Sequence, residues 1–312
     1  MDKTTWITIV NRAAGGGKTQ RDWPQIEALL TKHGVRFEPI FTSRRLHASI
    51  IAREKLREGY AKIIVVGGDG TMNEVINGLF SQGTIKTTEV MLGMISVGTG
   101  NDWARMFNIP GGYEEAVLTI KKQRTFIQDA GLVQYEKNGK EWKRYFINIA
   151  GMGFGARVVE RSNRMKNKGK SGPFLYFYNI FASLMGYKSQ QAAIEIDGKS
   201  FDRNVFSMFV GIGKYNGGGM IPVPHAVGDD GLYSITLIRK MGKLNILANV
   251  KRLYNGSIVD HSKVETYMAQ SVQITGSPRL QLETDGESLG NGPVSFKIIP
   301  RSVQIISGEL SA

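Results

Sequence analysis

The sequence predicts an α/β domain with a parallel sheet, followed by an antiparallel β-sandwich as a second domain. Three observations lead to this fold class. Up to about residue 130, short apolar runs alternate with amphipathic segments, which is the pattern of a parallel sheet covered by helices. After that point strand-like runs follow one another, and Asn-Gly and Asp-Gly turns separate several of them. The length of 312 residues suits two domains of ordinary size.

The first domain, residues 1–130, begins with an apolar run that ends at Asn11 and a cluster of glycines. The next segment places Trp23, Ile26 and two leucines at helical spacing, which predicts a helix packed on the sheet. The run at 62–66 is rich in β-branched residues and stops at two glycines, as a buried parallel strand does. The same reasoning predicts strands at 6–10, 37–41, 62–66 and 90–97, and helices at 22–33, 47–58 and 72–80.

The second domain, residues 131–312, consists mostly of strand-like runs, with the extreme C-terminus free to return to the first domain. Turn dipeptides at 138–139, 197–198 and 285–286 predict hairpins between antiparallel neighbours. Two helix-like segments, 172–187 and 244–254, interrupt the series. The predicted strands are 132–135, 145–149, 192–196, 205–212, 233–238, 272–275, 280–283, 294–299 and 303–306.

The composition, 41% hydrophobic and 21% charged, is that of an ordinary globular protein. The absence of cysteine excludes disulfides, iron–sulfur clusters and a thiol nucleophile. The start of the chain does not resemble a signal peptide, and the most apolar stretch, 173–187, is shorter than the roughly 20 residues that span a bilayer. We therefore expect a cytoplasmic protein.

The net charge of +13 indicates either an anionic partner or a lysine-rich surface. Between residues 137 and 170 ten basic residues stand against two acidic ones, so much of the excess is local. No zinc-ligand pair, ribonucleoprotein-type aromatic strand or basic zipper accompanies it, and we expect no nucleic-acid partner. A local basic segment is also suited to an anionic membrane surface.

A glycine-rich turn around Asp69 is the strongest chemical signal. Gly67-Gly68-Asp69-Gly70 joins a predicted strand to a predicted helix, where backbone N–H groups and the helix N-terminus attract phosphate. Because the carboxylate of Asp69 repels a phosphate unless a cation lies between them, the pattern indicates a Mg²⁺–nucleotide site. Glycine-rich exits also follow the strands at 6–10 and 90–97, and the carboxyl ends of parallel strands meet at one edge of a sheet.

Two common nucleotide motifs do not fit. Residues 17–19 end like a Walker A loop, but Arg12 stands where that motif needs glycine. The dinucleotide fingerprint fails because Asn73 takes the place of its third glycine. In the second domain, the segments 216–220, 228–232 and 284–287 are typical of hairpin loops, although the two carboxylates of the last one can supply a general base if the turn faces a nucleotide.

Taken in order, these blocks resemble the diacylglycerol kinase catalytic family, which includes sphingosine kinases and bacterial soluble lipid kinases. The resemblance covers nearly the whole chain and lies in residues 67–78, 98–105, 129–131, 147–154, 216–220, 229–232 and 285–287. It implies an α/β nucleotide domain joined to a β-sandwich, with the cleft between them. It also implies phosphoryl transfer from ATP to a lipid hydroxyl, first of all that of diacylglycerol, which gives phosphatidic acid.

The resemblance implies a role for each matching position. Glu287 would be the proton acceptor, with Asp285 in the same turn. Asp69, Asp102 and Asp129 would organise the catalytic Mg²⁺ through side chain or water. A structural Mg²⁺ would use Asp230 with backbone oxygens near Val227 and Leu232. ATP would contact Asn11, Arg12, Ala13, Ala14, Gly15, Thr42, Gly68, Asp69, Gly70, Thr71, Met72, Asn73, Glu74 and Thr99.

Some positions depart from the family pattern: Arg12 stands for the usual proline, His225 for a common aspartate and Trp103 for the usual phenylalanine. The alternatives that stay open are a kinase of phosphatidylglycerol or of a sphingoid base, an NAD kinase, and a non-catalytic lipid or nucleotide sensor. The resemblance further implies a lipid substrate at a membrane surface and peripheral attachment to an anionic membrane. It leaves the oligomeric state open, with a homodimer as one alternative.

Overall fold

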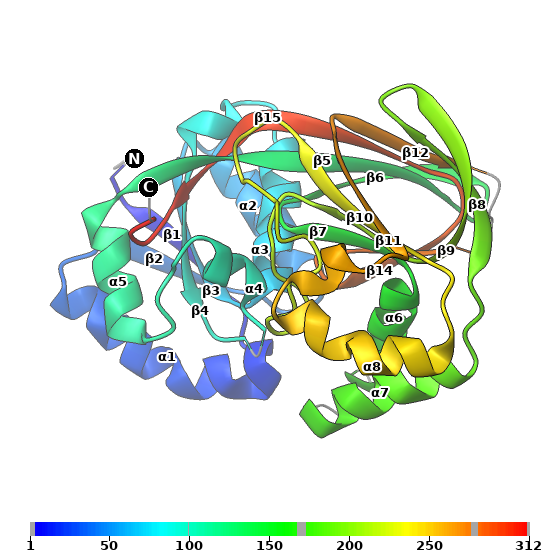
Figure 1. Ribbon diagram of the computed structural model, residues 1–312. Helices are drawn as coiled ribbons and strands as arrows, with labels where there is room; N and C mark the ends of the chain where they lie inside the picture. The colour runs from blue at the N-terminus through cyan, green and yellow to red at the C-terminus, as the bar shows by residue number, and fades with distance from the viewer. Residues whose placement is uncertain (1–3, 99, 167–172, 276–279, 311–312) are drawn as a thin grey trace. The chain divides into compact units, whose positions relative to one another are not determined.

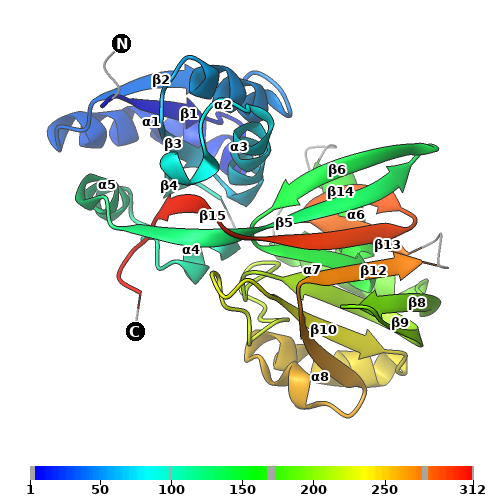
Figure 2. The ribbon, with the colours of Figure 1, turned by 90° about the horizontal axis from the view of Figure 1, so that it is seen from above.

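The computed structural model describes residues 4–98, 100–166, 173–275 and 280–310 (Figure 1). The chain divides into two compact units, which are residues 1–130 with 300–312 (unit 1) and residues 131–299 (unit 2). Unit 1 contains a parallel sheet with helices, and unit 2 contains antiparallel strands, which confirms the predicted fold class. The chain passes between the units in two paired strands, β5 (Thr125–Lys137) and β15 (Val294–Ile306), which run side by side in Figure 2.

The sheet of unit 1 has the strand order β15-β4-β3-β1-β2, and all of these neighbours pair in parallel. β1 is Trp6–Val10, β2 is Phe37–Phe41, β3 is Lys62–Gly67 and β4 is Met91–Ser96. β1 and β3 are buried almost along their whole length, which explains their unbroken apolar sequences. The predicted strands of the first domain are therefore confirmed to within a residue or two.

Helices cover this sheet on both faces (Figure 1). α1 (Ala14–Lys32) packs with α5 (Tyr113–Lys122), and α2 (His47–Arg57) packs with α3 (Asp69–Ser81). The first core cluster joins Trp23, Ile26 and Leu30 of α1 to the sheet. α5 and the short α4 (Asp102–Met106) were not predicted, although α5 has acidic residues in its first turn and lysines in its last. A 3₁₀ turn, η1 (Thr87–Glu89), leads into β4.

The strands of unit 2 follow the order β14-β13-β7-β9-β8-β12-β15, and β10 pairs with both β9 and β11. Their pairings are antiparallel, as the Asn-Gly and Asp-Gly turns predict. Phe146 stacks on Tyr233 at 5.9 Å between ring centroids, and Phe296 meets both rings edge-on, in the middle of the unit's core. The strands not yet given are β6 (Lys140–Phe146), β7 (Ile149–Gly153), β8 (Gln190–Ile196), β9 (Lys199–Gly211), β10 (Tyr233–Arg239), β11 (Val264–Ala269), β12 (Ser271–Thr275), β13 (Gln281–Thr284) and β14 (Glu287–Asn291).

Three predicted strands of the second domain have wrong boundaries. The segment 145–149 is not one strand, because the chain breaks between β6 and β7 at Ile147 and Asn148. The segments 294–299 and 303–306 are not two strands but one, because β15 pairs first with β12 in unit 2 and then with β4 in unit 1. These apolar runs do form strands, but nothing in the local sequence shows where a strand is interrupted or where it changes its pairing partner.

The helices of unit 2 are α6 (Phe154–Lys166), α7 (Pro173–Met185) and α8 (Lys243–Tyr254), with a 3₁₀ turn, η2 (Ser257–Asp260). α7 and α8 correspond to the two predicted helix-like segments, whereas α6 was not predicted. α6 packs on α7 and on β7, β13 and β14. Within the described residues no helix combines the length and hydropathy needed to cross a membrane.

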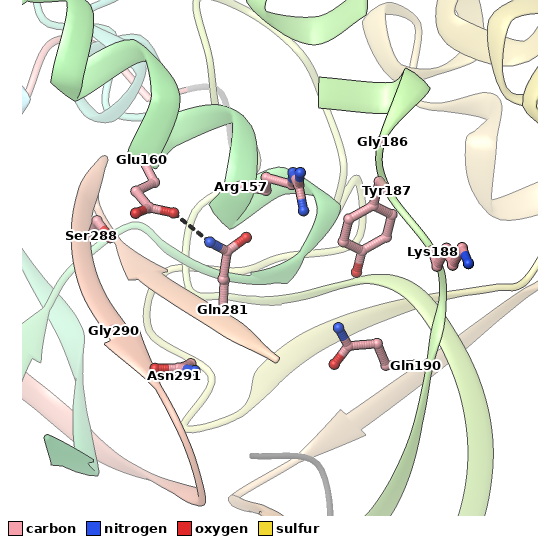
Figure 3. Close-up of a pocket in the computed structure, with 10 residues that line it drawn as sticks. All are labelled: Arg157, Glu160, Gly186, Tyr187, Lys188, Gln190, Gln281, Ser288, Gly290 and Asn291. Atoms are coloured by element: carbon pink, nitrogen blue, oxygen red, sulfur yellow. Dashed lines mark hydrogen bonds between the residues drawn. The ribbon is translucent and has the colours of Figure 1, made fainter. Parts of the chain in front are cut away.

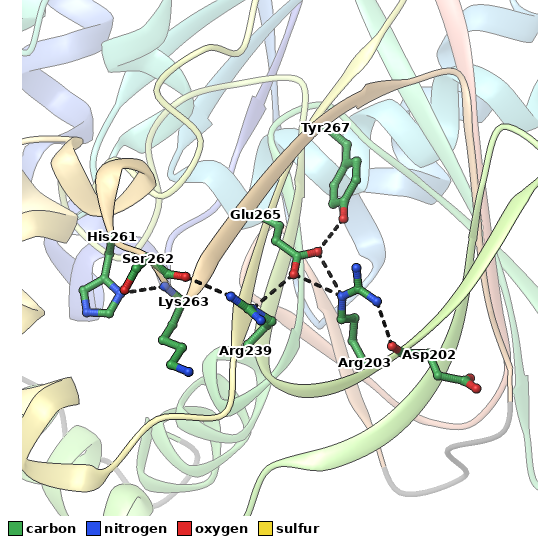
Figure 4. Close-up of polar contacts among 8 residues, drawn as sticks. All are labelled: Asp202, Arg203, Arg239, His261, Ser262, Lys263, Glu265 and Tyr267. Carbon is green, nitrogen blue, oxygen red and sulfur yellow. Dashed lines mark hydrogen bonds and ion pairs between the residues drawn. The ribbon is translucent and has the colours of Figure 1, made fainter.

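An ion-pair network ties β9, β10 and β11 together (Figure 4). Glu265 accepts from Nε of Arg203 at 3.0 Å on both carboxylate oxygens, and Nε of Arg239 lies 3.1 Å away. The Tyr267 hydroxyl donates to the same carboxylate at 2.5 Å. Partial burial raises the pKa of Glu265, but these donors outweigh it and leave the pKa below its usual range. The carboxylate is fully engaged, so this cluster holds strands together rather than forming a ligand site.

Candidate active site

Asn11, directly after β1, connects three strand ends of unit 1. Its side-chain NH₂ donates to Oγ1 of Thr71 at 2.9 Å, at the start of α3. Its side-chain oxygen accepts from the backbone N–H of Ala13 at 3.1 Å and from the hydroxyl of Thr42, after β2, at 3.4 Å. One amide side chain therefore fixes the positions of the loops that follow β1, β2 and β3.

The loop after β1 depends on glycine and on Arg12. Gly15, Gly16 and Gly17 have φ values of 61°, 67° and 86°, so the first turn of α1 is not regular helix. A Cβ on Gly15 would lie 2.6 Å from the backbone oxygen of Val97, after β4. The guanidinium of Arg12 lies 4.0 Å above the ring centroid of Phe41, where the family pattern has proline.

The turns after β3 and β4 touch each other at glycines. A Cβ on Gly98 would lie 3.2 Å from Cα of Gly68 and 2.5 Å from the side-chain oxygen of Asn101. A Cβ on Gly67 would lie 2.6 Å from Oγ1 of Thr71. The glycines thus allow a close approach of two strand exits, as the sequence predicts. Thr99, which the resemblance assigns to ATP, lies outside the described residues.

Asp69 and Asp102 belong to one arrangement. The Asp69 carboxylate accepts the backbone N–H groups of Asp102 at 3.1 Å and Trp103 at 3.3 Å, so it caps α4. A Cβ on Gly100 would lie 3.5 Å from Oδ2 of Asp69 and 3.4 Å from Oδ2 of Asp102. Both carboxylates therefore border the same small space at Gly100.

Asp129 is fully buried on β5, and its Oδ1 accepts the backbone N–H of Arg301 at 2.6 Å. Its neighbour Gln128 accepts from the Trp103 indole at 2.9 Å, which connects β5 to α4. In the part of the chain that the structure describes, no three acidic or histidine side chains lie close enough together to hold a metal ion. Mg²⁺ commonly uses one or two carboxylates together with waters and substrate phosphates, and Asp69 with Asp102 fit that smaller set.

The side chains at the start of α3 mostly serve packing. Met72 and Asn73 are fully buried, and Thr71 is nearly so. The Glu74 carboxylate accepts the backbone N–H groups of Leu46 at 2.8 Å and Ala48 at 3.1 Å, which caps α2. Of the residues assigned to ATP in this stretch, Gly68, Asp69 and Gly70 are therefore better suited to meet a ligand than Met72, Asn73 or Glu74.

The turn Asp285-Gly286-Glu287 joins β13 to β14 in unit 2. The Asp285 carboxylate accepts three backbone N–H groups, those of Ile147, Asn148 and Ile149, each at 3.1 Å. These amides lie at the break between β6 and β7, so Asp285 explains why the predicted strand 145–149 is interrupted. Sequence reasoning found the carboxylate but not this use of it.

The Asp230 turn also uses its own side chain. Oδ1 of Asp230 accepts the backbone N–H of Leu232 at 3.0 Å, a common local turn arrangement. Val227, which the resemblance places near the same metal, has an exposed side chain. A structural Mg²⁺ at Val227, Asp230 and Leu232 stays a prediction.

A cavity of about 520 Å³ lies in unit 2 beside α6 and β14 (Figure 3). Its lining is polar: Glu160 of α6 accepts from the Gln281 side chain across it, and the Tyr187 hydroxyl is buried. Burial raises the pKa of Tyr187 to about 12, although Arg157 opposes this. Ser288, which follows Glu287 directly, is one of the lining residues.

Comparison with known proteins identifies the family. Residues 5–133 match the diacylglycerol kinase catalytic domain, and residues 148–307 match the YegS C-terminal NAD kinase beta sandwich-like domain. Proteins described as diacylglycerol kinase from Staphylococcus aureus strains RF122 and MRSA252 are 30% identical over 302 residues, which cover 96% of this chain and 91% of theirs. The chain belongs to the diacylglycerol kinase family. Membership makes it a lipid kinase, and ATP is the phosphate donor that such a family implies.

Solved structures of the diacylglycerol kinase family share the fold. One from Bacillus anthracis, described as a diacylglycerol kinase, aligns with a TM-score of 0.73 at 22% identity over 98% of this chain and 97% of its own. Yeast NADH kinase complexed with NADH aligns with a TM-score of 0.55 at 11% identity over 98% of this chain and 84% of its own. The likeness to the NADH kinase is one of fold.

Replacing Asp285 by alanine leaves the amides of the β6–β7 break without their acceptor. Hydrogen bonds to a charged group contribute about 1.5–3 kcal/mol. We expect Asp285→Ala to lower the free energy of unfolding by about that amount, measured by urea denaturation. Asp202→Ala, at an exposed position of β9, is the control and should stay within about 0.5 kcal/mol of the wild type. Equal stability of the two variants would show that Asp285 does not hold the break.

Proposed function

We propose that the protein is an ATP- and Mg²⁺-dependent lipid kinase that transfers the γ-phosphate to the hydroxyl of diacylglycerol, which gives phosphatidic acid. The observation that carries the proposal is the meeting of three glycine-rich strand exits around Asn11, Gly68 and Gly98 beside the carboxylates of Asp69 and Asp102. The names of the curated relatives support diacylglycerol as the first acceptor. Phosphatidylglycerol and sphingoid bases are the other acceptors to test.

In unit 1, the residues bind and orient the phosphates. The backbone at Gly68–Gly70 and the N-terminus of α3 offer N–H groups and a favourable dipole to an anion. Asn11 keeps the neighbouring loops in place for this approach. Asp69 and Asp102 would hold Mg²⁺, which neutralises phosphate charge when bound. Asp129 is fully buried and accepts a backbone N–H of β15, so it would help to keep β5 and β15 in place next to this site.

In unit 2, Glu287 would accept the proton of the attacking lipid hydroxyl. Asp285 accepts three backbone N–H groups, which makes it a structural residue and favours Glu287 as the base. As the carboxylate takes the proton, the hydroxyl oxygen bonds to the γ-phosphorus, the bond from that phosphorus to the β–γ bridging oxygen breaks, and ADP leaves.

The test of the proposed function is a kinase assay with labelled ATP in mixed micelles. The acceptor panel is diacylglycerol, phosphatidylglycerol, a sphingoid base and NAD. We expect labelled phosphatidic acid from the wild type and none from Asp69→Asn, which keeps one oxygen to cap α4. Label on none of the acceptors would favour a non-catalytic sensor, and label on NAD alone would overturn the lipid assignment.

Glu287→Gln should lower kcat by on the order of 10²–10⁴-fold, because the amide cannot accept the proton. The KM for ATP should change little, because glutamine has the size of glutamate and residue 287 is assigned to the lipid hydroxyl. Steady-state kinetics at saturating ATP measures both. Glu141→Gln, at an exposed position on β6, is the matched control. A Glu287→Gln enzyme with wild-type kcat would remove the base role from this residue.

We also propose that α7 and α8 carry the peripheral membrane contact. Phe181 and Met185 on α7 are 53% and 58% exposed, and Leu244 on α8 is 84% exposed. The Lys243 ammonium donates to the backbone oxygen of Met185 at 2.5 Å, which joins the two helices. Exposed apolar side chains on α7 and α8, together with Lys243 and Lys251 of α8, suit the surface of an anionic leaflet. Lys168 and Lys170 of the predicted basic segment lie outside the described residues.

Phe181→Glu combined with Leu244→Glu should reduce co-sedimentation with vesicles that contain phosphatidylserine, because buried apolar area is lost and charge is repelled. Turnover of a short-chain, water-soluble diacylglycerol should stay unchanged. Leu118→Glu on α5, 38% exposed in the wild type, is the control for a surface charge. Vesicle binding equal to that of the control would place the membrane contact elsewhere.

A further inference from the structure

Glu283 is a buried carboxyl next to the Asp285-Gly286-Glu287 turn, and the reaction described above does not use it. It lies on β13 and is 1% exposed. A Cβ on Gly151 of β7 would lie 2.5 Å from its Oε1, so the carboxyl rests directly against a glycine of the neighbouring strand. A charged residue in such a place needs a physical reason, because burying it without compensation is costly.

The contacts of Glu283 lead to the peptide that precedes Glu287. Oε2 of Glu283 accepts the backbone N–H of Gly286 at 2.9 Å. The side-chain NH₂ of Asn163, on α6, donates to the backbone oxygen of Gly286 at 3.0 Å. Hydrogen bonds therefore hold Gly286 at both its backbone N–H and its backbone oxygen. Its φ of 81° favours glycine here.

Glu283 also lies beside a second loop. The Asn216 side chain is near enough to its carboxyl to oppose the rise of its pKa, and Asn216 pairs with Met220 across the glycine-rich loop 216–220. The same loop is tied to the β6–β7 break, because the Asn148 side chain donates to the backbone oxygen of Tyr215 at 2.9 Å. Asp285 holds that break as well, so these hydrogen bonds converge on the turn that precedes Glu287.

The surroundings favour the uncharged form of Glu283. Burial, and then the negative charges of Asp285 and Glu287, raise its pKa to about 8, against the opposing effects of the Gly286 N–H and the nearby Asn216 side chain. β7 offers no ionisable group, and Glu160 of α6 is already paired with Arg164. Among the side chains that the structure describes, the remaining ionisable ones on the elements packed against β13 and beside the joined loop are Arg157, Arg161, Lys214 and Tyr215.

We propose that Glu283, as an uncharged carboxyl, and Asn163 are positioning residues that fix Gly286 and so aim Glu287 at the lipid hydroxyl. The proposal rests on the base role assigned to Glu287 above. A neutral acceptor holds the turn without placing a third negative charge beside Asp285 and Glu287. If Glu283 ionised, repulsion within the turn would move the Glu287 side chain and change its proton affinity.

The kinetic experiment compares Glu283→Gln, Glu283→Ala and Asn163→Ala with the wild type. Glu283→Gln keeps an uncharged acceptor for Gly286 and should retain kcat near neutral pH within about twofold. Its kcat should persist above pH 8, where that of the wild type falls because Glu283 ionises. Glu283→Ala should lose about 10²-fold in kcat, since small misplacements of reacting groups have effects of that size. The KM for ATP should be unchanged in all three.

A double variant, Glu283→Ala with Asn163→Ala, tests whether both residues act through Gly286. Its loss in kcat should be smaller than the product of the two single losses, because the second substitution releases a peptide that is already loose. Wild-type kcat in Glu283→Ala, or identical pH profiles of kcat for wild type and Glu283→Gln, would overturn the proposal.

Two NMR measurements on the full chain need no catalysis, so they separate this proposal from the proposed function. The ¹³C shift of the Glu283 carboxyl should titrate near pH 8, well above an ordinary glutamate. The Gly286 amide should exchange slowly with solvent in the wild type and in Glu283→Gln, and rapidly in Glu283→Ala. A carboxyl that titrates near pH 4.5, or rapid exchange in the wild type, would overturn the positioning role even in an active enzyme.

Discussion

Backbone N–H groups at chain breaks and helix starts need acceptors, and acidic side chains of the motifs provide them throughout this protein. Asp69 accepts from the start of α4, Glu74 from the start of α2, and Asp285 from the break between β6 and β7. Each carboxylate lies far along the sequence from the amides that it accepts. The bond therefore fixes one element against another, and its loss would move a loop as well as remove a charge.

This constraint gives the motif residues two roles that a sequence cannot separate. The glycine-rich turn at Asp69 attracts phosphate, yet the Asp69 carboxylate also holds Asp102 and Trp103 in place. A carboxylate has lone pairs on both oxygens, so two N–H bonds still leave acceptor sites for a cation or its waters. Asp285 differs, because three amides share its two oxygens and little capacity remains for chemistry.

The sequence predicts well what depends on neighbouring residues. Strands such as 62–66 and the glycine contact between the exits of β3 and β4 follow from local pattern and from the rule that parallel strands end at one edge. Features set by distant partners were missed: the break at Ile147 is made by Asp285, and β15 continues because it changes partner from β12 to β4. α4 is only five residues long, too short for its period to stand out.

Glu283, Asp285 and Glu287 lie in one short segment, but their surroundings give the three carboxyl groups different roles. Glu283 is buried with Gly151 against it, which disfavours its charge, whereas Asp285 is surrounded by N–H donors that stabilise a negative charge. Glu287 follows at the start of β14 and is partly exposed. The chain turns back at Asp285 and Gly286, so β14 runs beside β13 and Glu287 pairs with Thr284, the residue next to Glu283. The positive φ of Gly286 serves this hairpin, and the hairpin in turn sets where Glu287 lies along β14.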